Sequence, residues 1–107
     1  MGLDKRERLL RKKLEGLVIL ITGGATGIGR ATAIQAAREG ARLAIADVAT
    51  QAGRETAAKI NETGSEAIFF PADISQAAEV SSLIERTLGH FGQLDGAFNN
   101  AGIEGNL

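Results

Sequence analysis

The sequence predicts an α/β protein with a doubly wound parallel sheet, and two observations carry this prediction. First, about four short apolar runs, each suited to a buried strand, alternate with segments that have helical periodicity. Second, glycines or polar residues follow each apolar run directly. Such alternation is typical of right-handed βαβ units, for which we expect the strand order 3-2-1-4. A chain of 107 residues is long enough for one domain with a modest core.

The first expected strand is Leu17–Ile21, an unbroken apolar run, and the glycine-rich segment TGGATGIG (Thr22–Gly29) follows it. A helix is expected from about Thr26 to Arg38, with Gly40 in the left-handed conformation after its end. Its inner face is expected to consist of Ile28, Ala31, Ile34 and Ala37. Helix N-termini present free N–H groups, and glycines let an anion approach them closely. This segment therefore predicts an anion site, with a nucleotide as the first candidate.

The remaining elements follow the same alternation of strand and helix. Asp47 ends the second strand, Asp73 follows the third and Asn99–Gly102 follow the fourth. Because the C-terminal ends of parallel strands share one edge of a sheet, we expect these residues to meet there. The expected strands are 42–47, 67–70 and 94–98, and the expected helices are capped by Thr50 and Ser75 and end near Asn61 and at Gly89 or Gly92.

The acidic residues at this edge indicate the kind of nucleotide. Asp47 lies 18 residues beyond Gly29, where a carboxylate can accept hydrogen bonds from both ribose hydroxyls of an adenosine and would repel a 2′-phosphate. Thr26 and Val48 are not basic, so NAD is favoured over NADP. Asp73 can accept a hydrogen bond from an adenine amino group, but it is also a typical residue of a helix N-terminal turn, and both interpretations stay open.

Charge is unevenly distributed along a chain whose net charge is −1. Residues 1–13 carry six basic and two acidic side chains. We interpret residues 1–15 as a basic lead-in, helical and packed on the body through its leucines, rather than as a nucleic-acid-binding or membrane-binding segment. No apolar run approaches the roughly 20 residues that span a bilayer, and cysteine is absent, so we expect a cytoplasmic protein without a membrane partner. No cluster has metal-ligand spacing, and we expect no metal site.

The motifs in combination resemble the N-terminal half of a short-chain dehydrogenase/reductase. The resemblance rests on TGGATGIG, on Asp47 in IADV, on the pair Asp73-Ile74, and on FGQLD (Phe91–Asp95) running into NNAG. It covers about residues 16–103, and it identifies residues 16–107 as a partial NAD-binding domain of the Rossmann type. In that family the glycine turn holds the pyrophosphate, the first acidic residue the ribose and the second the adenine. The cofactor-binding residues that the resemblance implies are Thr22, Gly23, Gly27, Ile28, Gly29, Asp47, Asp73, Ile74, Asn99, Ala101 and Gly102.

Two details of the NNAG segment also come from the resemblance. Thr22 is expected to tie its turn to this segment, and Asn100 is expected to be partly structural. Asn99, Ala101 and Gly102 would line the nicotinamide side of the cofactor.

The resemblance also identifies what this chain lacks. Family members continue for more than about another hundred residues and supply a Ser, a Tyr and a Lys, in a Tyr-x-x-x-Lys arrangement, that move a proton to or from the substrate. This sequence contains no tyrosine, and its last lysine, Lys59, precedes the third expected strand. We therefore assign no catalytic residue. The expected chain is a truncated NAD(H)-binding portion of an oxidoreductase, which would exchange hydride between nicotinamide and an alcohol or carbonyl carbon only in a full-length form.

Two alternatives remain beside this interpretation. The chain could be a non-catalytic nucleotide-binding or interaction module that pairs through its fourth strand, whose open edge also favours self-association. Another Rossmann-type enzyme, such as a methyltransferase, is disfavoured by the NNAG segment after the fourth strand.

Overall fold

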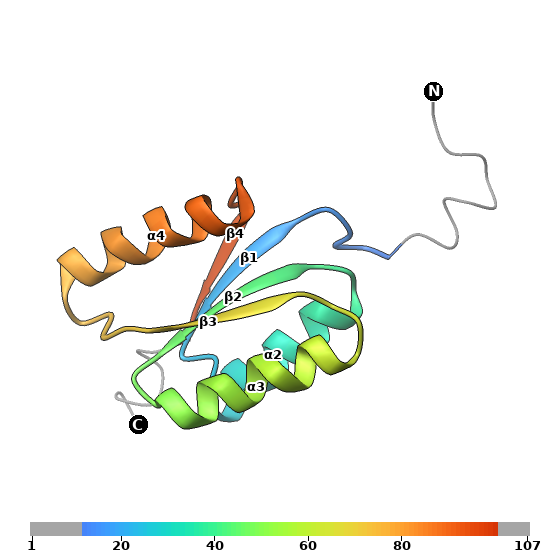
Figure 1. Ribbon diagram of the computed structural model, residues 1–107, viewed down its shortest axis with the longest axis horizontal. Helices are drawn as coiled ribbons and strands as arrows, with labels where there is room; N and C mark the ends of the chain where they lie inside the picture. The colour runs from blue at the N-terminus through green and yellow to red at the C-terminus, as the bar shows by residue number, and fades with distance from the viewer. Residues whose placement is uncertain (1–11, 101–107) are drawn as a thin grey trace.

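The structure is a computed structural model that describes residues 12–100. In it the chain forms a parallel sheet between two layers of helices (Figure 1). Helices α2 and α3 cover one face of the sheet, and α4 covers the other (Figure 1). The strand order is β3-β2-β1-β4, and every neighbouring pair is parallel, which confirms the predicted doubly wound arrangement. The elements in chain order are β1 (Val18–Thr22), α2 (Gly27–Arg38), β2 (Arg42–Asp47), α3 (Thr50–Glu62), β3 (Ala67–Pro71), α4 (Ala77–Phe91) and β4 (Gly96–Asn99).

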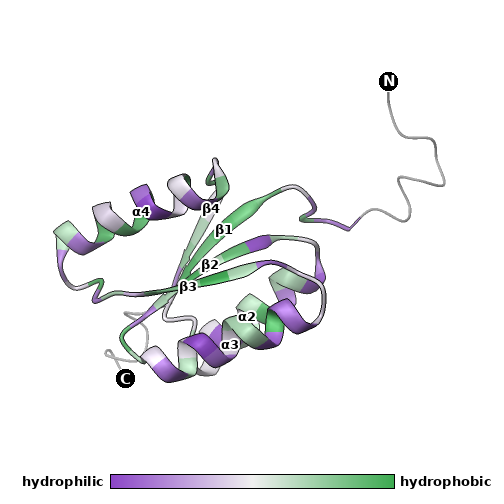
Figure 2. Ribbon diagram, viewed as in Figure 1, coloured by the Kyte–Doolittle hydropathy of each residue, from purple (hydrophilic) through white to green (hydrophobic). Residues whose placement is uncertain are grey.

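The two central strands are apolar on both faces because helices cover both. Val18 and Leu20 of β1 pack with the side chains of α4, whereas Ile21 packs with those of α2 and α3. Successive strand residues point to opposite faces, so a strand covered on both sides reads as a continuous apolar run. Figure 2 shows β1 and β2 largely green for this reason. The observed β1 begins and ends one residue later than predicted, and β2 has the predicted bounds.

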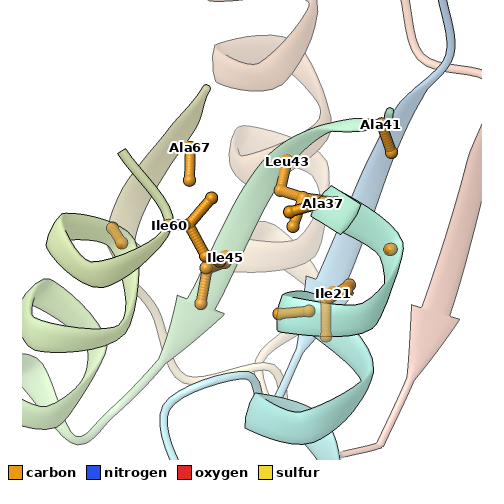
Figure 3. Close-up of a cluster of buried hydrophobic side chains, with 10 residues drawn as sticks. Ile21, Ala37, Ala41, Leu43, Ile45, Ile60 and Ala67 are labelled. Atoms are coloured by element: carbon orange, nitrogen blue, oxygen red, sulfur yellow. The ribbon is translucent and has the colours of Figure 1, made fainter. Parts of the chain in front are cut away.

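The larger core cluster lies between the sheet and helices α2 and α3 (Figure 3). Ile21, Leu43 and Ile45 are fully buried there, beside Ala37 of α2 and Ile60 of α3. Burying one such large aliphatic side chain contributes about 1.5–3 kcal/mol to stability. The small alanines on α2 let that helix approach the sheet closely.

The inner face of α2 differs from the predicted one. Ile28 is 61% exposed and Ala31 is also exposed. The buried residues of α2 are Gly29, Ala33, Ala36 and Ala37. The helix contacts the preceding turn so closely that a residue without a side chain must face inward at position 29, which sets the rotation of the helix. The left-handed residue after the helix is Gly40 as predicted, with φ at +98°.

The predicted caps Thr50 and Ser75 are wrong. The N-cap residues of α3 and α4 are Ala49 and Gln76, and neither makes a side-chain capping bond. Instead, an aspartate that precedes each helix accepts a backbone N–H at the start of that helix. Asp47 Oδ1 accepts the Ala49 N–H at 3.0 Å, and Asp73 Oδ1 accepts the Ser75 N–H at 3.0 Å. A carboxylate bonded to the backbone two residues later is a common turn device, and here it follows both β2 and β3.

Strand β4 begins at Gly96 rather than at the predicted Leu94. Asp95 explains the difference, because its Oδ2 accepts the Val18 N–H at 2.8 Å. The Gln93 amide donates to the same oxygen at 2.7 Å. Both bonds hold the pKa of Asp95 below its ordinary value of 3.8, with the Val18 backbone bond as the largest cause. The Asp95 N–H itself donates to the Val18 carbonyl at 2.9 Å, so the side chain replaces a backbone carbonyl only as the acceptor for the Val18 N–H.

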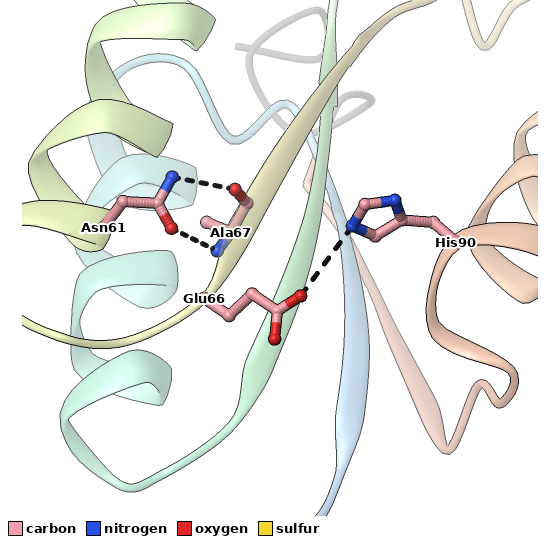
Figure 4. A network of polar contacts seen from close by, with 4 residues as sticks. All are labelled: Asn61, Glu66, Ala67 and His90. Atoms are coloured by element: carbon pink, nitrogen blue, oxygen red, sulfur yellow. Dashed lines mark hydrogen bonds and ion pairs between the residues drawn. The ribbon is translucent and has the colours of Figure 1, made fainter.

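Two pairs of residues make polar contacts at the same end of the sheet, near the start of β3 (Figure 4). The Asn61 amide donates to the Ala67 carbonyl at 3.0 Å and accepts the Ala67 N–H at 2.9 Å, which fixes the end of α3 to the start of β3. His90 Nε2 lies 3.8 Å from a Glu66 carboxylate oxygen. Both of these side chains are exposed, so the second contact adds little to stability.

The basic lead-in expected at residues 1–15 lies mostly outside the described residues, because the description begins at residue 12. Residues 13–16 form turns rather than a helix. Within residues 12–100, no helix is both long and apolar enough to cross a membrane.

Candidate functional site

The glycine turn between β1 and α2 is built on backbone contacts. Gly23 and Gly27 have φ at +70° and +57°, the left-handed region that favours glycine. The Gly23 N–H donates to the Ala46 carbonyl at 2.8 Å, which joins the turn to the end of β2. A Cβ on Gly29 would lie only 1.9 Å from the Gly23 carbonyl oxygen. The turn and the first turn of α2 are therefore in direct contact, with no side chain between them.

The N-terminus of α2 opens from this turn. Thr26 is the N-cap residue, but its side chain makes no capping hydrogen bond, and the first turn of the helix contains no acidic residue. The first N–H groups of a helix have no partner within the helix, and they carry a partial positive charge. This end of α2 can therefore accept an anionic group.

Asp47 connects the end of β2 to the glycine turn. Its Oδ2 accepts the Ala25 N–H at 3.1 Å, while its Oδ1 accepts the Ala49 N–H at 3.0 Å. Each carboxylate oxygen can accept more than one hydrogen bond, so both retain capacity for a ligand hydroxyl. Asp47 is therefore fixed in position by the backbone while it remains able to bind.

Thr56 on α3 supports the same turn, and the sequence interpretation missed it. Its side chain is fully buried, and Oγ1 lies 3.1 Å from the Ala25 carbonyl oxygen and 3.0 Å from that of Ala52. The available signal was a threonine at helical spacing from Gly53 and Ile60, both of which are buried. A hydroxyl on the inner face of a helix needs a partner, and here that partner is the glycine turn.

Asp73 forms the turn that precedes α4. Its Oδ1 accepts the Ser75 hydroxyl at 2.7 Å as well as the Ser75 N–H. These bonds, the hydroxyl first, hold the pKa of Asp73 below its ordinary value of 3.8, so the group is ionised at neutral pH. The turn interpretation of Asp73 therefore applies. Its second oxygen is left for a ligand, and the adenine contact stays a prediction.

The two asparagines at the end of β4 have different surroundings. Thr22 Oγ1 donates to Asn99 Oδ1 at 2.9 Å, which is the expected tie between the turn and this segment. Asn99 itself is exposed, whereas Asn100 is only 4% exposed. The Asn100 Nδ2 donates to the Gly23 carbonyl at 3.4 Å, and its buried Oδ1 has no partner among residues 12–100. A buried carbonyl oxygen without a donor is costly, so a ligand that supplies a donor would be stabilised here.

These residues surround a cavity of about 310 Å³ at the C-terminal ends of the strands. Four of the predicted site residues line it, namely Gly23, Asp47, Asp73 and Ile74. Six lining residues were not among the predicted ones: Thr26, Ala46, Val48, Ala72, Ser75 and Asn100. Thr22, Gly27, Ile28, Gly29 and Asn99 do not line it, and Ala101 and Gly102 lie outside the described residues.

The cavity suits part of a dinucleotide. Its volume is at the lower end of the range of about 300 to 1,000 Å³ for ligand pockets. Because Gly23 and Gly29 have no Cβ, no side chain there keeps a phosphate away from the backbone N–H groups. The buried Asn100 Oδ1 lacks a hydrogen-bond donor that a ligand could supply. None of the lining residues is basic. Within residues 12–100, no three His, Cys, Asp or Glu side chains are grouped as they would be around a metal ion.

Comparison with known proteins gives a consistent result at three levels. Residues 17–107 match the sequence model of the short chain dehydrogenase family. Levodione reductase of Leifsonia aquatica is 46% identical over 90 residues, which are 82% of this chain and 34% of that protein. Tropinone reductase-like 2 of Erythroxylum coca is 44% identical over 92 residues, 86% of this chain and 32% of that protein. The chain thus spans about a third of the length of these curated relatives.

Solved structures agree with this match. A short chain dehydrogenase/reductase from Burkholderia phymatum in complex with NAD superposes with a TM-score of 0.78 at 35% identity, over 80% of this chain and 31% of that one. The hydroxysteroid dehydrogenase of Escherichia coli also gives a TM-score of 0.78, at 30% identity, over 80% of this chain and 37% of that one.

Proposed function

Because this chain belongs to the short-chain dehydrogenase/reductase family, we propose that it forms the dinucleotide-binding part of an oxidoreductase that acts on an alcohol or carbonyl group. The observation that carries the proposal is the position of Asp47, which is bonded to the Ala25 N–H of the glycine turn and lines the cavity at the strand ends. When bound, the nicotinamide would supply or accept the hydride. The chain's own residues bind and orient the cofactor.

Each part of the site has a proposed task. The N-terminus of α2 and the glycine turn hold the pyrophosphate through backbone N–H groups. Asp47 accepts hydrogen bonds from the adenosine ribose, and Asp73 with Ile74 contacts the adenine. Asn99, Ala101 and Gly102 line the nicotinamide side, and Asn100 Oδ1 accepts a donor from the ligand.

We propose NAD rather than NADP as the preferred cofactor. Two carboxylates, Asp47 and Asp73, line the cavity, and no basic side chain lines it to balance a 2′-phosphate. Two like charges about 4 Å apart repel by about 4 kcal/mol at an effective dielectric constant of about 20. A third of that repulsion already disfavours NADPH about tenfold.

Catalysis needs a group that handles the hydroxyl proton of the substrate. The sequence contains no tyrosine, so a Tyr-x-x-x-Lys pair would have to come from residues outside these 107. We therefore expect weak dinucleotide binding and no turnover from this chain by itself, and a small-molecule substrate only in a longer form.

A fluorescence titration tests the proposal. NADH added to the 107-residue chain is expected to give a saturable enhancement at up to about millimolar concentration, with NADPH binding about tenfold more weakly. Asp47→Asn keeps the shape of the side chain but removes its charge. It is expected to weaken NADH binding about tenfold, because hydrogen bonds to charged groups contribute about 1.5–3 kcal/mol. It should also reduce the difference in affinity between NADH and NADPH.

The matched control is Glu62→Gln, which removes an exposed carboxylate at the end of α3 and should leave both affinities unchanged. If NADPH bound as tightly as NADH, the proposed role of Asp47 would be wrong. If no signal appeared at about millimolar NADH, the chain would not bind the cofactor on its own.

A second candidate function is an interaction module without catalysis. Strand β4 is at one end of the strand order and pairs only with β1 among the described strands. On α4, Ile84 and Leu88 are 38% and 44% exposed. An exposed strand edge beside apolar side chains favours association with another chain. Light scattering that reports a monomer at all concentrations, unchanged in Leu88→Lys, would remove this candidate.

Two further expectations remain proposals. A cytoplasmic location is favoured by the lack of cysteine in the sequence. A division into a basic lead-in, residues 1–15, and a dinucleotide-binding unit, residues 16–107, is favoured by the contrast in charge between the two.

A further inference from the structure

Ala25 lies in the middle of the glycine turn, and side chains from outside the turn bond both of its backbone polar groups. Its N–H donates to Asp47 Oδ2 at 3.1 Å, and its carbonyl oxygen lies 3.1 Å from Thr56 Oγ1. Ala25 is fully buried, so water does not substitute for either partner. Within residues 12–100, no backbone N–H donates to this carbonyl. The backbone conformation at Ala25 therefore depends on two side chains, one from β2 and one from α3.

The Thr56 hydroxyl has one proton and two carbonyl oxygens within reach. The Ala25 oxygen is at 3.1 Å and the Ala52 oxygen at 3.0 Å. Within a helix, the carbonyl four residues earlier already accepts a backbone N–H, so Ala52 does not need the hydroxyl. The Ala25 carbonyl has no such partner, and a buried carbonyl without a donor is costly. The hydroxyl therefore donates to Ala25.

A second contact joins Asp47 to the same helix. Its Oδ1 accepts the N–H of Ala49, the N-cap residue of α3, at 3.0 Å. The hydrogen bonds of Asp47 with Ala25 and of Ala25 with Thr56 thus belong to a closed ring, which α3 completes from Thr56 back to Ala49. In such a network each bond restricts the geometry of the others.

This ring fixes the direction of the Asp47 carboxylate. One oxygen is bonded on the side of the glycine turn and the other on the side of α3, so rotation of the carboxylate breaks both bonds. Loss of the Thr56 hydroxyl would leave the Ala25 carbonyl buried without a donor. The carbonyl could find another donor only if the backbone turned, and that movement would take the Ala25 N–H out of line with Asp47.

We propose that Thr56 is a positioning residue for cofactor binding, which holds Asp47 in the direction that the adenosine ribose requires. This inference rests on the proposed function, because it concerns the preference for NADH over NADPH. Thr56 does not line the cavity. Its hydroxyl acts through Ala25 and Asp47, so its removal reduces the preference between the two cofactors and not only the affinity for them.

Amide hydrogen exchange measured by NMR tests the link without any cofactor. Thr56→Val keeps the shape of the side chain and removes the hydroxyl. It is expected to speed exchange of the Ala25 N–H at least about tenfold, because that group loses its alignment with Asp47. The Gly23 N–H, which donates to the Ala46 carbonyl in the same turn, should change much less. Thr56→Ser keeps the hydroxyl and should restore slow exchange.

Thr87→Val is the matched control, because Thr87 is also a fully buried threonine on a helix. Its Oγ1 donates to the Leu83 carbonyl of the same helix at 2.8 Å, and that helix, α4, covers the other face of the sheet (Figure 1). This variant removes a buried hydroxyl but should leave the Ala25 N–H unchanged. Equal Ala25 exchange rates in Thr56→Val and Thr87→Val would overturn the proposal.

A fluorescence titration with NADH and NADPH tests the effect on the cofactor. Thr56→Val is expected to reduce the ratio of the two affinities by about threefold or more, which is the effect of about one hydrogen bond. Thr56→Ser and Thr87→Val should keep the ratio. If Thr56→Val weakened both cofactors by the same factor, Thr56 would only support the turn, and its proposed role would be wrong.

Failure of the proposed function gives a different result. In that case neither cofactor would bind the unmodified chain or any variant. The exchange rate of the Ala25 N–H would still decide whether Thr56 positions Asp47, because that measurement needs no ligand.

Discussion

Gly29 is the position where the fold and the candidate site depend most directly on one missing side chain. A Cβ there would lie 1.9 Å from the Gly23 carbonyl oxygen and 2.7 Å from its carbonyl carbon, and Cβ contacts under 3.0 Å essentially do not occur. Both neighbours are backbone atoms, so Gly29→Ala must move α2 away from the turn by about 1 Å. Overpacking of this kind costs about 1–3 kcal/mol.

A smaller effect opposes that cost. Replacing glycine by alanine within a helix gains about 1 kcal/mol from backbone entropy and helix propensity. We therefore expect Gly29→Ala to lower the free energy of unfolding by up to about 2 kcal/mol. Each kcal/mol lost corresponds to a melting temperature lower by about 4–8 °C. Dinucleotide binding should weaken as well, because the turn that would hold the phosphates must shift.

Gly89→Ala is the matched control, since nothing lies within 4 Å of a Cβ at that position of α4. Only the gain in helix propensity remains there, so this variant is expected to be more stable than the unmodified chain by about 1 kcal/mol. Urea unfolding followed by circular dichroism measures both. Equal stability of the two variants would refute the close contact between α2 and the glycine turn.

Three more predictions concern the supports of the fold and site. Thr56→Val removes the hydroxyl that bonds the Ala25 carbonyl, so it should cost about 1–3 kcal/mol in urea unfolding, while Thr56→Ser should restore most of the loss. Gly53→Ala would place a Cβ 2.0 Å from the Phe69 ring, and a double-mutant cycle with Phe69→Leu should show that the smaller side chain relieves part of the destabilisation; additive effects would contradict the contact. The pKa of Asp95 is depressed in the folded state, so its stabilising contribution is present above its ordinary value of 3.8 and is lost as pH falls through the folded value. Unfolding midpoints measured between about pH 5 and about pH 3 should therefore fall less in Asp95→Asn than in the unmodified chain.

Much of the fold could be predicted because its signals are local. The apolar runs of β1 and β2 identify strands covered on both faces, and the alternation of elements gives the strand order. The rotation of α2 could not be predicted in the same way. Ile28 was assigned to the inner face because it is apolar, but the contact with the turn requires the smallest residue, Gly29, at that place. Hydrophobic periodicity does not measure how closely two backbones approach.

The candidate site was predictable to a similar degree. Asp47 and Asp73 were expected at the strand ends because every parallel strand delivers its last residues to the same edge, and both line the cavity. Spacing alone could not distinguish Asn99 from Asn100, because the two are adjacent and identical in type; the expectation that Asn100 is partly structural came from the family resemblance. Only the direction of each side chain decides that Asn100 is buried. Thr56 was missed because its partner is a backbone carbonyl 31 residues away.

The pairing of β1 with β4 also means that the two sides of the site are synthesised at different times. The bonds of Val18 to Asp95, Thr22 to Asn99 and Gly23 to Asn100 each span 77 residues. The contacts of β1 with β2 and of the glycine turn with Asp47 need far less of the chain. At a synthesis rate of about 5–20 residues per second, the β4 side follows β1 by about 4 to 15 s. A nascent chain can therefore assemble the glycine turn and Asp47 first, and Asn100 joins the site only when β4 pairs with β1.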